Sequence, residues 1–219
     1  MNVTISGELL VCSELRVLYW PGRQTLFVSD VHLGKAASFR SASVPVPSGT
    51  TDRTLHRLSI ALDLYGPTRL VILGDLWHAA AGRILDVEAK VEAWRCHYGH
   101  MEMILVEGNH DRKSGKLPHA FNVRELETLD EAPFHLCHEP CTAEGYVLCG
   151  HLHPGVAFSA KGTRSLRLPC FWFAETFGVL PAFGEFTGFG AISPSASDQI
   201  IAIGDNKLHR IPPELAIAR

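Results

Sequence analysis

Three short, largely apolar runs in the first half of the chain constrain the fold most, because each ends in a group of polar residues. The runs are Gln24–Val28, Arg69–Leu73 and Glu102–Val106. Such a run is typical of a strand buried on both faces. Helical patterns lie between them, over about Thr50–Tyr65 and about Ile84–Tyr98, and Gly66 and Gly99 end the two helices. This alternation predicts βαβ units and a parallel sheet.

The apolar residues of the first helix are Leu55, Leu58, Ile60, Leu62 and Leu64. The second half of the chain is richer in strands, joined by turns that contain Gly and Pro. These strands are Phe134–His138, Tyr146–Gly150, Leu166–Phe173, Gly178–Phe183 and Gln199–Ile203. Short connections favour antiparallel pairing for part of them. With no repeat or linker in 219 residues, the sequence predicts a single α/β domain over residues 1–219, with two packed sheets and helices outside.

Composition narrows the class of protein. Apolar residues make up 46% of the chain and charged residues 20%, which is typical of a folded globular protein. The net charge of −3 leaves no overall basic footprint for nucleic acid. The N-terminus shows no basic leader before an apolar stretch, and no apolar segment reaches the length of about 18 residues that a membrane span needs. We therefore expect a cytoplasmic protein that does not bind a membrane.

Six cysteines are scattered through predicted strands and a helix. Without a secretory leader, this distribution predicts reduced thiols rather than disulfides. Cys137 and Cys141 are spaced loosely like zinc ligands, but no second cysteine pair completes a tetrahedral site. A structural zinc ion is therefore not expected from the sequence.

Seven side chains with metal-binding chemistry follow the strands. They are Asp30, His32, Asp75, Asn109, His138, His151 and His153. Residues two apart in a strand point the same way, so Asp30 with His32 can hold one ion, and the two histidines of Gly150–Pro154 can do likewise. Carboxylate, amide and imidazole donors together suit Mn²⁺, Fe²⁺ or Zn²⁺. One such motif would be weak, but five in order, each after an apolar strand, indicate a metal centre.

In order, the motifs read D-x-H, G-D-x-x-H, G-N-H-D, H and G-H-x-H over about residues 25–154. This series resembles the signature of the calcineurin-like metallophosphoesterase superfamily. The resemblance implies a four-layer α-β-β-α sandwich of two mixed β-sheets flanked by helices. It also implies one metal held by Asp30, His32 and His153. A second would be held by Asn109, His138 and His151, with Asp75 bridging the two.

The same resemblance assigns the catalytic residues. His110 would contact the phosphate and help protonate the leaving oxygen, with Asp111 and His78 as its partners. His138 is preferred to the nearby His135, because the run His138–Pro140 matches the family pattern.

Further segments extend the likeness to nearly the whole chain. They are Asp30–Arg40, Val44–Pro47, Leu168–Phe171 and Leu180–Gly188. They resemble the bacterial ligase-associated DNA damage response endonucleases, which are manganese-dependent nucleases encoded near a DNA ligase and a helicase. The run Gly74–His78 is similar to a motif of double-strand-break repair nucleases. The resemblance implies a DNA substrate, two Mn²⁺ ions, and a functional association with a ligase and a helicase.

We therefore expect a dinuclear metal-dependent phosphodiesterase that acts as a DNA endonuclease, on single-stranded DNA, in DNA repair. Two metals about 4 Å apart would supply a hydroxide that attacks the phosphodiester. Their positive charge makes the loaded cavity electropositive although the protein is acidic. Lys35, Arg40 and Arg112 would contact the nucleic-acid backbone, although each is equally well explained as part of a solvated charged loop.

Two alternatives stay open. A phosphodiesterase or phosphatase for a small nucleotide or other small phosphoester would use the same metal site. A non-catalytic scaffold on the same fold is disfavoured, because His110 and every expected ligand are present. The aromatic run Phe171–Phe173 could stack on bases but is expected to be a core strand, and Trp77 could line or roof the substrate cleft.

Overall fold

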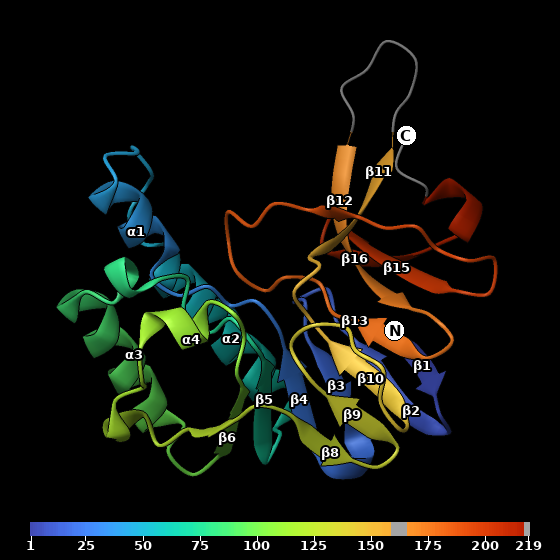
Figure 1. Cartoon of the computed structure of the whole chain (residues 1–219), viewed down its shortest axis with the longest axis horizontal. Coiled ribbons are helices and arrows are strands. Elements are labelled where there is room, and N and C mark those ends of the chain that lie inside the picture. Colours follow the sequence, from blue (N-terminus) through green and yellow to red (C-terminus); the bar gives the residue numbers. More distant parts are fainter. Residues whose placement is uncertain (159–165, 217–219) are drawn as a thin grey trace.

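Two β-sheets lie face to face at the centre of the fold, and the α-helices gather against one of them (Figure 1). The computed structural model describes residues 1–158 and 166–216. The α-helices are α1 (Lys35–Ser41), α2 (Thr50–Tyr65), α3 (Leu85–His97) and α4 (Asp111–Ser114). Short 3₁₀ helices are η1 (Pro21–Arg23), η2 (Ala80–Gly82), η3 (His119–Phe121) and η4 (Pro213–Leu215). None of the helices in this described part is long and apolar enough to cross a membrane.

The first sheet follows the chain in the order β1 to β7. Its strands are β1 (Asn2–Ile5), β2 (Glu8–Cys12), β3 (Leu18–Trp20), β4 (Thr25–Val28), β5 (Arg69–Leu73), β6 (Glu102–Val106) and β7 (Arg124–Leu126). Strands β4 to β7 run parallel, which confirms the predicted βαβ units. Strands β1 to β3 are antiparallel and were not predicted. The sequence did contain a signal for the first two of these strands, which is the Ser6-Gly7 turn between two short runs that alternate in burial.

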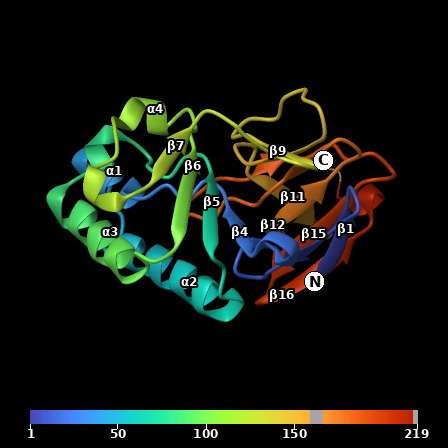
Figure 2. The same cartoon turned by 90° about the horizontal axis from the view of Figure 1, so that it is seen from below.

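The second sheet is mixed and contains every later strand of the described residues. Its strands are β8 (Leu129–Glu131), β9 (Phe134–Leu136), β10 (Tyr146–Cys149), β11 (Pro154–Phe158), β12 (Leu166–Phe173), β13 (Phe177–Val179), β14 (Gly190–Ala191), β15 (Gln199–Gly204) and β16 (Lys207–Ile211). Figure 2 shows β9, β11, β12, β15 and β16 of this sheet. β10 pairs in parallel with β9 and β13, whereas β12 pairs antiparallel with β11, β13 and β15. Two mixed sheets flanked by helices confirm the predicted sandwich.

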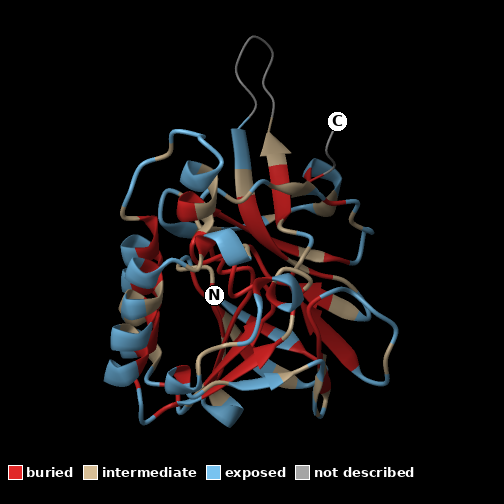
Figure 3. Ribbon diagram, turned by 60° about the vertical axis from the view of Figure 1, so that its left-hand side comes forward, coloured by how far each residue is buried: buried red, intermediate tan, exposed pale blue. Residues whose placement is uncertain are grey.

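Side-chain burial shows how the layers hold together (Figure 3). Phe27, Phe171 and Phe173 lie in the core between the sheets, which confirms the core assignment of the β12 aromatics. On the other face of the first sheet, α2 buries Leu58 and Leu62. Ile60 and Leu64 of the same helix are exposed, so its predicted apolar face is narrower than expected.

The second sheet has no comparable helical cover within the described residues. Its outer face is packed by connecting segments, including Ile192 and the end of η4 at Ala216. The fold therefore leaves the ends of both sheets and their loops to build a site.

Candidate metal centre

Strand ends bring the predicted ligands together. β4, β5 and β6 are parallel, so the segments after them meet at one edge of the first sheet. Asp30, Asp75 and Asn109 follow these strands directly. His138 follows β9, and His151 and His153 follow β10 and precede β11. The site thus lies where the ends of the two sheets meet.

Asp30, His32 and His153, the predicted ligands of the first metal, lie together and are called the first triad below. The Nε2 atoms of His32 and His153 lie 3.4 Å apart. Asp30 is fully buried; its Oδ2 accepts the His151 amide at 3.0 Å. Its Oδ1 lies 3.1 Å from His153 Nε2 yet accepts no hydrogen bond from the described residues. A buried carboxylate oxygen facing two imidazole nitrogens fits a divalent cation among them.

Asn109, His138 and His151, the predicted ligands of the second metal, also lie together and are called the second triad. His138 Nε2 lies 3.1 Å from Asn109 Oδ1 and 3.2 Å from His151 Nδ1. On the other side of the ring, His138 Nδ1 donates to the Leu73 carbonyl at 3.0 Å. That bond leaves the lone pair of Nε2 turned toward the triad, as in metal-binding histidines. His138, rather than the alternative His135, therefore stands in this cluster.

Asp75 stands between the triads. Its Oδ1 lies 3.4 Å from His138 Nε2, and its Oδ2 lies 3.9 Å from His32 Nε2. Burial raises the pKa of this carboxyl group, while His138 and the backbone amide of His110 lower it. One oxygen faces each triad, which is the arrangement a bridging ligand needs.

The backbone at the ligands differs from the sequence-based expectation. β4 ends at Val28 and β10 at Cys149, so the paired ligands do not alternate along a strand. Five ligands instead have left-handed backbones, with φ between 45° and 64°: Asp30, His32, Asp75, His151 and His153. A non-glycine residue held in a sparsely populated region costs about 1–3 kcal/mol. The strand explanation was therefore wrong, although the ligands it grouped do converge.

Two motif glycines allow the loops to approach one another. A Cβ on Gly108 would lie 2.1 Å from Asp75 Oδ1, and one on Gly74 would lie 2.1 Å from His138 Nδ1. Contacts this short are not tolerated, so any side chain at these positions would displace a ligand. The motifs G-D-x-x-H and G-N-H-D thus need glycine at these positions, because there is no space for a side chain beside Asp75 and His138.

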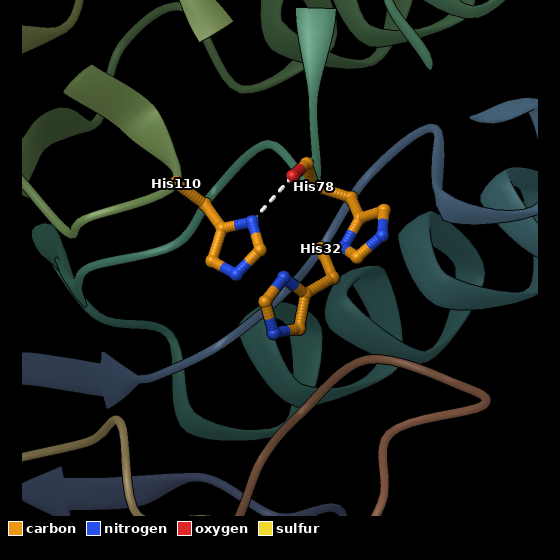
Figure 4. Close-up of side chains that lie close together, drawn as sticks. All are labelled: His32, His78 and His110. Carbon is orange, nitrogen blue, oxygen red and sulfur yellow. Dashed lines mark hydrogen bonds between the residues drawn. The ribbon is translucent and has the colours of Figure 1, made fainter. Parts of the chain in front are cut away.

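Three histidines form the outer part of the site (Figure 4). His110 Nδ1 donates to the backbone carbonyl of His78, which leaves Nε2 as the free nitrogen, 3.9 Å from Asp75 Oδ2. The His78 and His110 rings stack with centroids 5.1 Å apart, and His32 meets both edge-on. Burial, with Lys35 and His110, lowers the pKa of His78 to about 4, so its ring is neutral at pH 7. The predicted pairing of His110 with His78 is therefore present.

Asp111 was predicted to assist His110, but its carboxylate is engaged elsewhere. Its Oδ1 accepts the Trp77 amide and its Oδ2 accepts the Gly108 amide, each at 3.0 Å. Burial raises its pKa to about 6. Asp111 thus joins the two loops that follow β5 and β6. Trp77 is fully buried in the helix-side core and does not line the cleft.

The three predicted substrate-binding residues differ in position. Lys35 is partly buried and lines a small cavity beside His32, together with threonines of α2. Burial lowers the pKa of Lys35, whereas Asp30 and Asp75 raise it. Arg40 and Arg112 are exposed, and each donates to a backbone carbonyl at the long distance of 3.4 Å. Lys35 is therefore the one of the three that lies beside the ligand residues.

A supporting loop was missed by sequence reasoning. The Phe183 amide donates to the Ser29 carbonyl, and the Gly184 amide to the Asp30 carbonyl, both at 2.9 Å. Two partly buried arginines hold this loop: Arg57 donates to the Phe183 carbonyl and Arg16 to the Ala182 carbonyl. The sequence signal for this loop was the run Leu180–Gly188, which was considered only as part of the family resemblance. Its position shows that it supports the first triad.

Comparison with solved structures shows a strong similarity to a nuclease. The nuclease MPE of Pseudomonas putida is 37% identical in sequence, with a TM-score of 0.84 over 96% of this chain and 99% of that one. No protein-family model and no curated protein matches the sequence.

Two other solved structures resemble the chain weakly. The phosphoesterase YfcE of E. coli is 16% identical, with a TM-score of 0.40 over 89% of this chain and 99% of that one. A predicted phosphoesterase of Streptococcus pneumoniae is 12% identical, with a TM-score of 0.26 over 89% and 91%. Both scores are too low to add to the interpretation of the site.

Proposed function

Because this chain belongs to the calcineurin-like metallophosphoesterases and to the nuclease-like family within them, we propose that it hydrolyses DNA phosphodiesters with two divalent metal ions. It is a metal-dependent phosphoesterase. One observation carries the proposal for two metals. Asp75 is buried between two ligand triads and presents one carboxylate oxygen to each.

The ligand residues fit two divalent ions. One would be held by Asp30, His32 and His153 and the other by Asn109, His138 and His151, with Asp75 shared. The unsatisfied Oδ1 of Asp30 supports this assignment, because a buried carboxylate oxygen without a partner is costly. Bound ions would neutralise charge on the phosphate and make a water acidic enough to act at neutral pH. Nitrogen and oxygen donors in this mixture suit Mn²⁺, with Fe²⁺ or Zn²⁺ as alternatives.

His110 is placed to act on the leaving group. The His78 carbonyl fixes the ring through Nδ1, and the free Nε2 faces the ligand cluster. The side chain is 36% exposed, so a substrate can reach it. In its charged form His110 would donate a proton from Nε2 to the departing sugar oxygen, a role that contributes about 10²–10⁴-fold to rate in other enzymes.

The proposal of a DNA substrate rests on the charge of the metal-loaded site and on the family to which the chain belongs. Two divalent ions would bring four positive charges against the carboxylates of Asp30 and Asp75, so the loaded site attracts a phosphate backbone. Lys35 lies beside the ligands, and Arg40 and Arg112 offer exposed positive charge nearby in sequence. We further propose internal cleavage of single-stranded DNA during DNA repair. Functional association with a ligase and a helicase is proposed from the family resemblance alone.

The test is incubation of pure protein with circular single-stranded DNA, with and without Mn²⁺. Bis(p-nitrophenyl) phosphate is assayed in parallel. Asp75→Ala removes the shared ligand, and Asp86→Ala in the exposed first turn of α3 is the matched control. We expect manganese-dependent conversion of circles to linear molecules, lost in Asp75→Ala and retained in Asp86→Ala.

Other outcomes redirect the proposal. If the circles stay intact while the small diester is hydrolysed rapidly, the metal site is supported and the substrate is a small phosphoester. If Asp75→Ala still cleaves the circles, the reaction does not depend on this metal site.

A further inference from the structure

A second group of metal-binding side chains lies on the edge of the second sheet, apart from the phosphoesterase site. It contains His135, Cys137 and Cys141. One nitrogen of His135 and both sulfur atoms lie within 4.8 Å of one another. His135 belongs to β9, which pairs with the edge strand β8 (Figure 1). Cys141 is exposed in the segment after it.

The strand places the first two groups on one face. Phe134 and Leu136 point into the core between the sheets. His135 and Cys137, the residues alternating with them, therefore face outward. Cys137 packs there with Val147 of β10. The segment after His138 then returns Cys141 to this face, where the two Sγ atoms lie 3.6 Å apart.

The geometry of the sulfur atoms matches a tetrahedral ion. With zinc–sulfur bonds of about 2.3 Å, two cysteines on one tetrahedral zinc ion have sulfur atoms about 3.8 Å apart. The observed separation of 3.6 Å is close to that value without any movement. A disulfide, by contrast, would require the sulfur atoms to approach to about 2.05 Å.

A carboxylate completes the resemblance to a zinc site. Asp130 lies opposite His135 in the antiparallel register of β8 and β9. Its Oδ1 is 2.6 Å from His135 Nδ1. Histidines that bind metal usually carry such a carboxylate partner, which fixes the orientation of the ring. Asp130 therefore orients the imidazole.

We propose that His135, Cys137 and Cys141 bind one zinc ion that is distinct from the phosphoesterase metals. The sequence argument against zinc was the lack of a second cysteine pair. His135 supplies a third protein donor, and a water molecule would take the fourth position of a tetrahedral ion. Without an ion, the Cys137 thiol donates to the Glu139 carbonyl. Binding would tie the exposed segment around Cys141 back to β9, beside His138. The ion would thus stabilise the end of β9.

The test uses full-length, tag-free, metal-stripped protein under reducing conditions, titrated with Co²⁺ and then with Zn²⁺. A thiolate–cobalt charge-transfer band in the near ultraviolet reports on this site alone, because the phosphoesterase ligands contain no sulfur. Because the phosphoesterase ligands also bind Co²⁺, we expect the band to rise over up to three equivalents to a plateau of one thiolate-bound ion per chain, and excess Zn²⁺ to remove it. Cys141→Ser should abolish it, whereas Cys96→Ser, at another exposed cysteine, should not.

Asp130→Asn keeps all three ligands and should weaken Zn²⁺ binding by about 10- to 100-fold, as loss of an orienting partner does elsewhere. Because Asp130 and Cys141 are exposed, both variants should fold. Absence of the band in the wild type, or an equal band in Cys141→Ser, would overturn the proposal. A disulfide between Cys137 and Cys141 would also overturn it. In that case the two cysteines would resist alkylation until a reductant is added.

Discussion

The two ligand triads of the phosphoesterase site are built alike but differ in charge. Each takes ligands from both sheets, and both lie beside Asp75. The first triad contains a fully buried carboxylate, Asp30, whose Oδ1 is without a hydrogen bond from the described residues. The second contains an amide and two imidazoles and no carboxylate, and its polar atoms face one another at 3.1 and 3.2 Å. The first position therefore needs a cation more than the second does.

This difference has a consequence for metal binding. An extra negative charge at contact distance contributes several kcal/mol of attraction even where solvent screens it to an effective dielectric of about 20. We therefore expect the ion of the first triad to bind more tightly and to exchange more slowly. The second ion would be the one lost first on dilution or chelation.

The largest effect is expected from Asp75→Ala, which removes the one residue common to both positions. Both ions should bind more weakly, and hydrolysis of bis(p-nitrophenyl) phosphate should fall by at least about 1,000-fold. Calorimetric titration with Mn²⁺ reports binding, and steady-state assays report turnover. Near wild-type turnover would show that the two triads do not act together.

His110→Ala should separate chemistry from metal binding. His110 belongs to neither triad, and its Nε2 only approaches Asp75 Oδ2 at 3.9 Å. We expect turnover to fall by about 100- to 1,000-fold with both Mn²⁺ ions still bound. Calorimetry on the same preparation provides the check. If the variant loses an ion, His110 is a ligand and the division into two triads is incomplete.

Gly108→Ala tests whether the space beside Asp75 matters. The new Cβ would lie 2.1 Å from Asp75 Oδ1, the oxygen that faces the second triad. Displacing that oxygen should reduce turnover by about 10- to 100-fold, the range seen when a ligand loses its orientation. Gly188→Ala is the control, because its Cβ would meet no described atom within 4 Å. Equal activity of the two variants would contradict the packing argument.

The residue types and order of the ligands were predictable from the sequence, because strand ends and motif spacing are local features. The parallel order of β4, β5 and β6 followed from the same pattern. The role of each individual site residue remains a prediction, and so does the organisation as a single domain. What the sequence could not indicate was the left-handed backbone at residues such as Asp30 and Asp75, since neither is a residue type that requires it.

Long-range contacts were also beyond the sequence. Arg57 and Phe183 are 126 residues apart, and no local pattern connects them. The strands β1 to β3 were missed because they are short and partly exposed, and because Glu8 and Glu14 stand beside their apolar residues. His135 was considered only as an alternative to His138, and its place beside two cysteines depends on the return of the segment that carries Cys141.

The charge difference itself can be tested by exchanging the two side chains. Asp30→Asn should weaken the tighter Mn²⁺ site, and Asn109→Asp should strengthen the weaker one, each by about 10-fold, corresponding to about 1.4 kcal/mol. Calorimetric titration should then show two affinities that move closer together in either variant. Unchanged affinities in both would show that the charge of Asp30 does not set the order of binding.

The smallest effect is expected from Arg57→Leu, which should disturb only the first triad. Arg57 donates to the Phe183 carbonyl and lies over the Phe183 ring at 4.4 Å, and the next residue, Gly184, bonds the Asp30 backbone. Loss of this partly buried hydrogen bond to a charged group should cost up to about 1.5–3 kcal/mol of unfolding free energy, measurable by urea denaturation. Mn²⁺ affinity should fall a few-fold at the tighter site and stay constant at the weaker one. Arg210→Leu provides the control, because this exposed arginine of β16 donates to the Asn2 carbonyl and not to the loop. An equal loss at both metal positions would contradict a loop that supports the first triad alone.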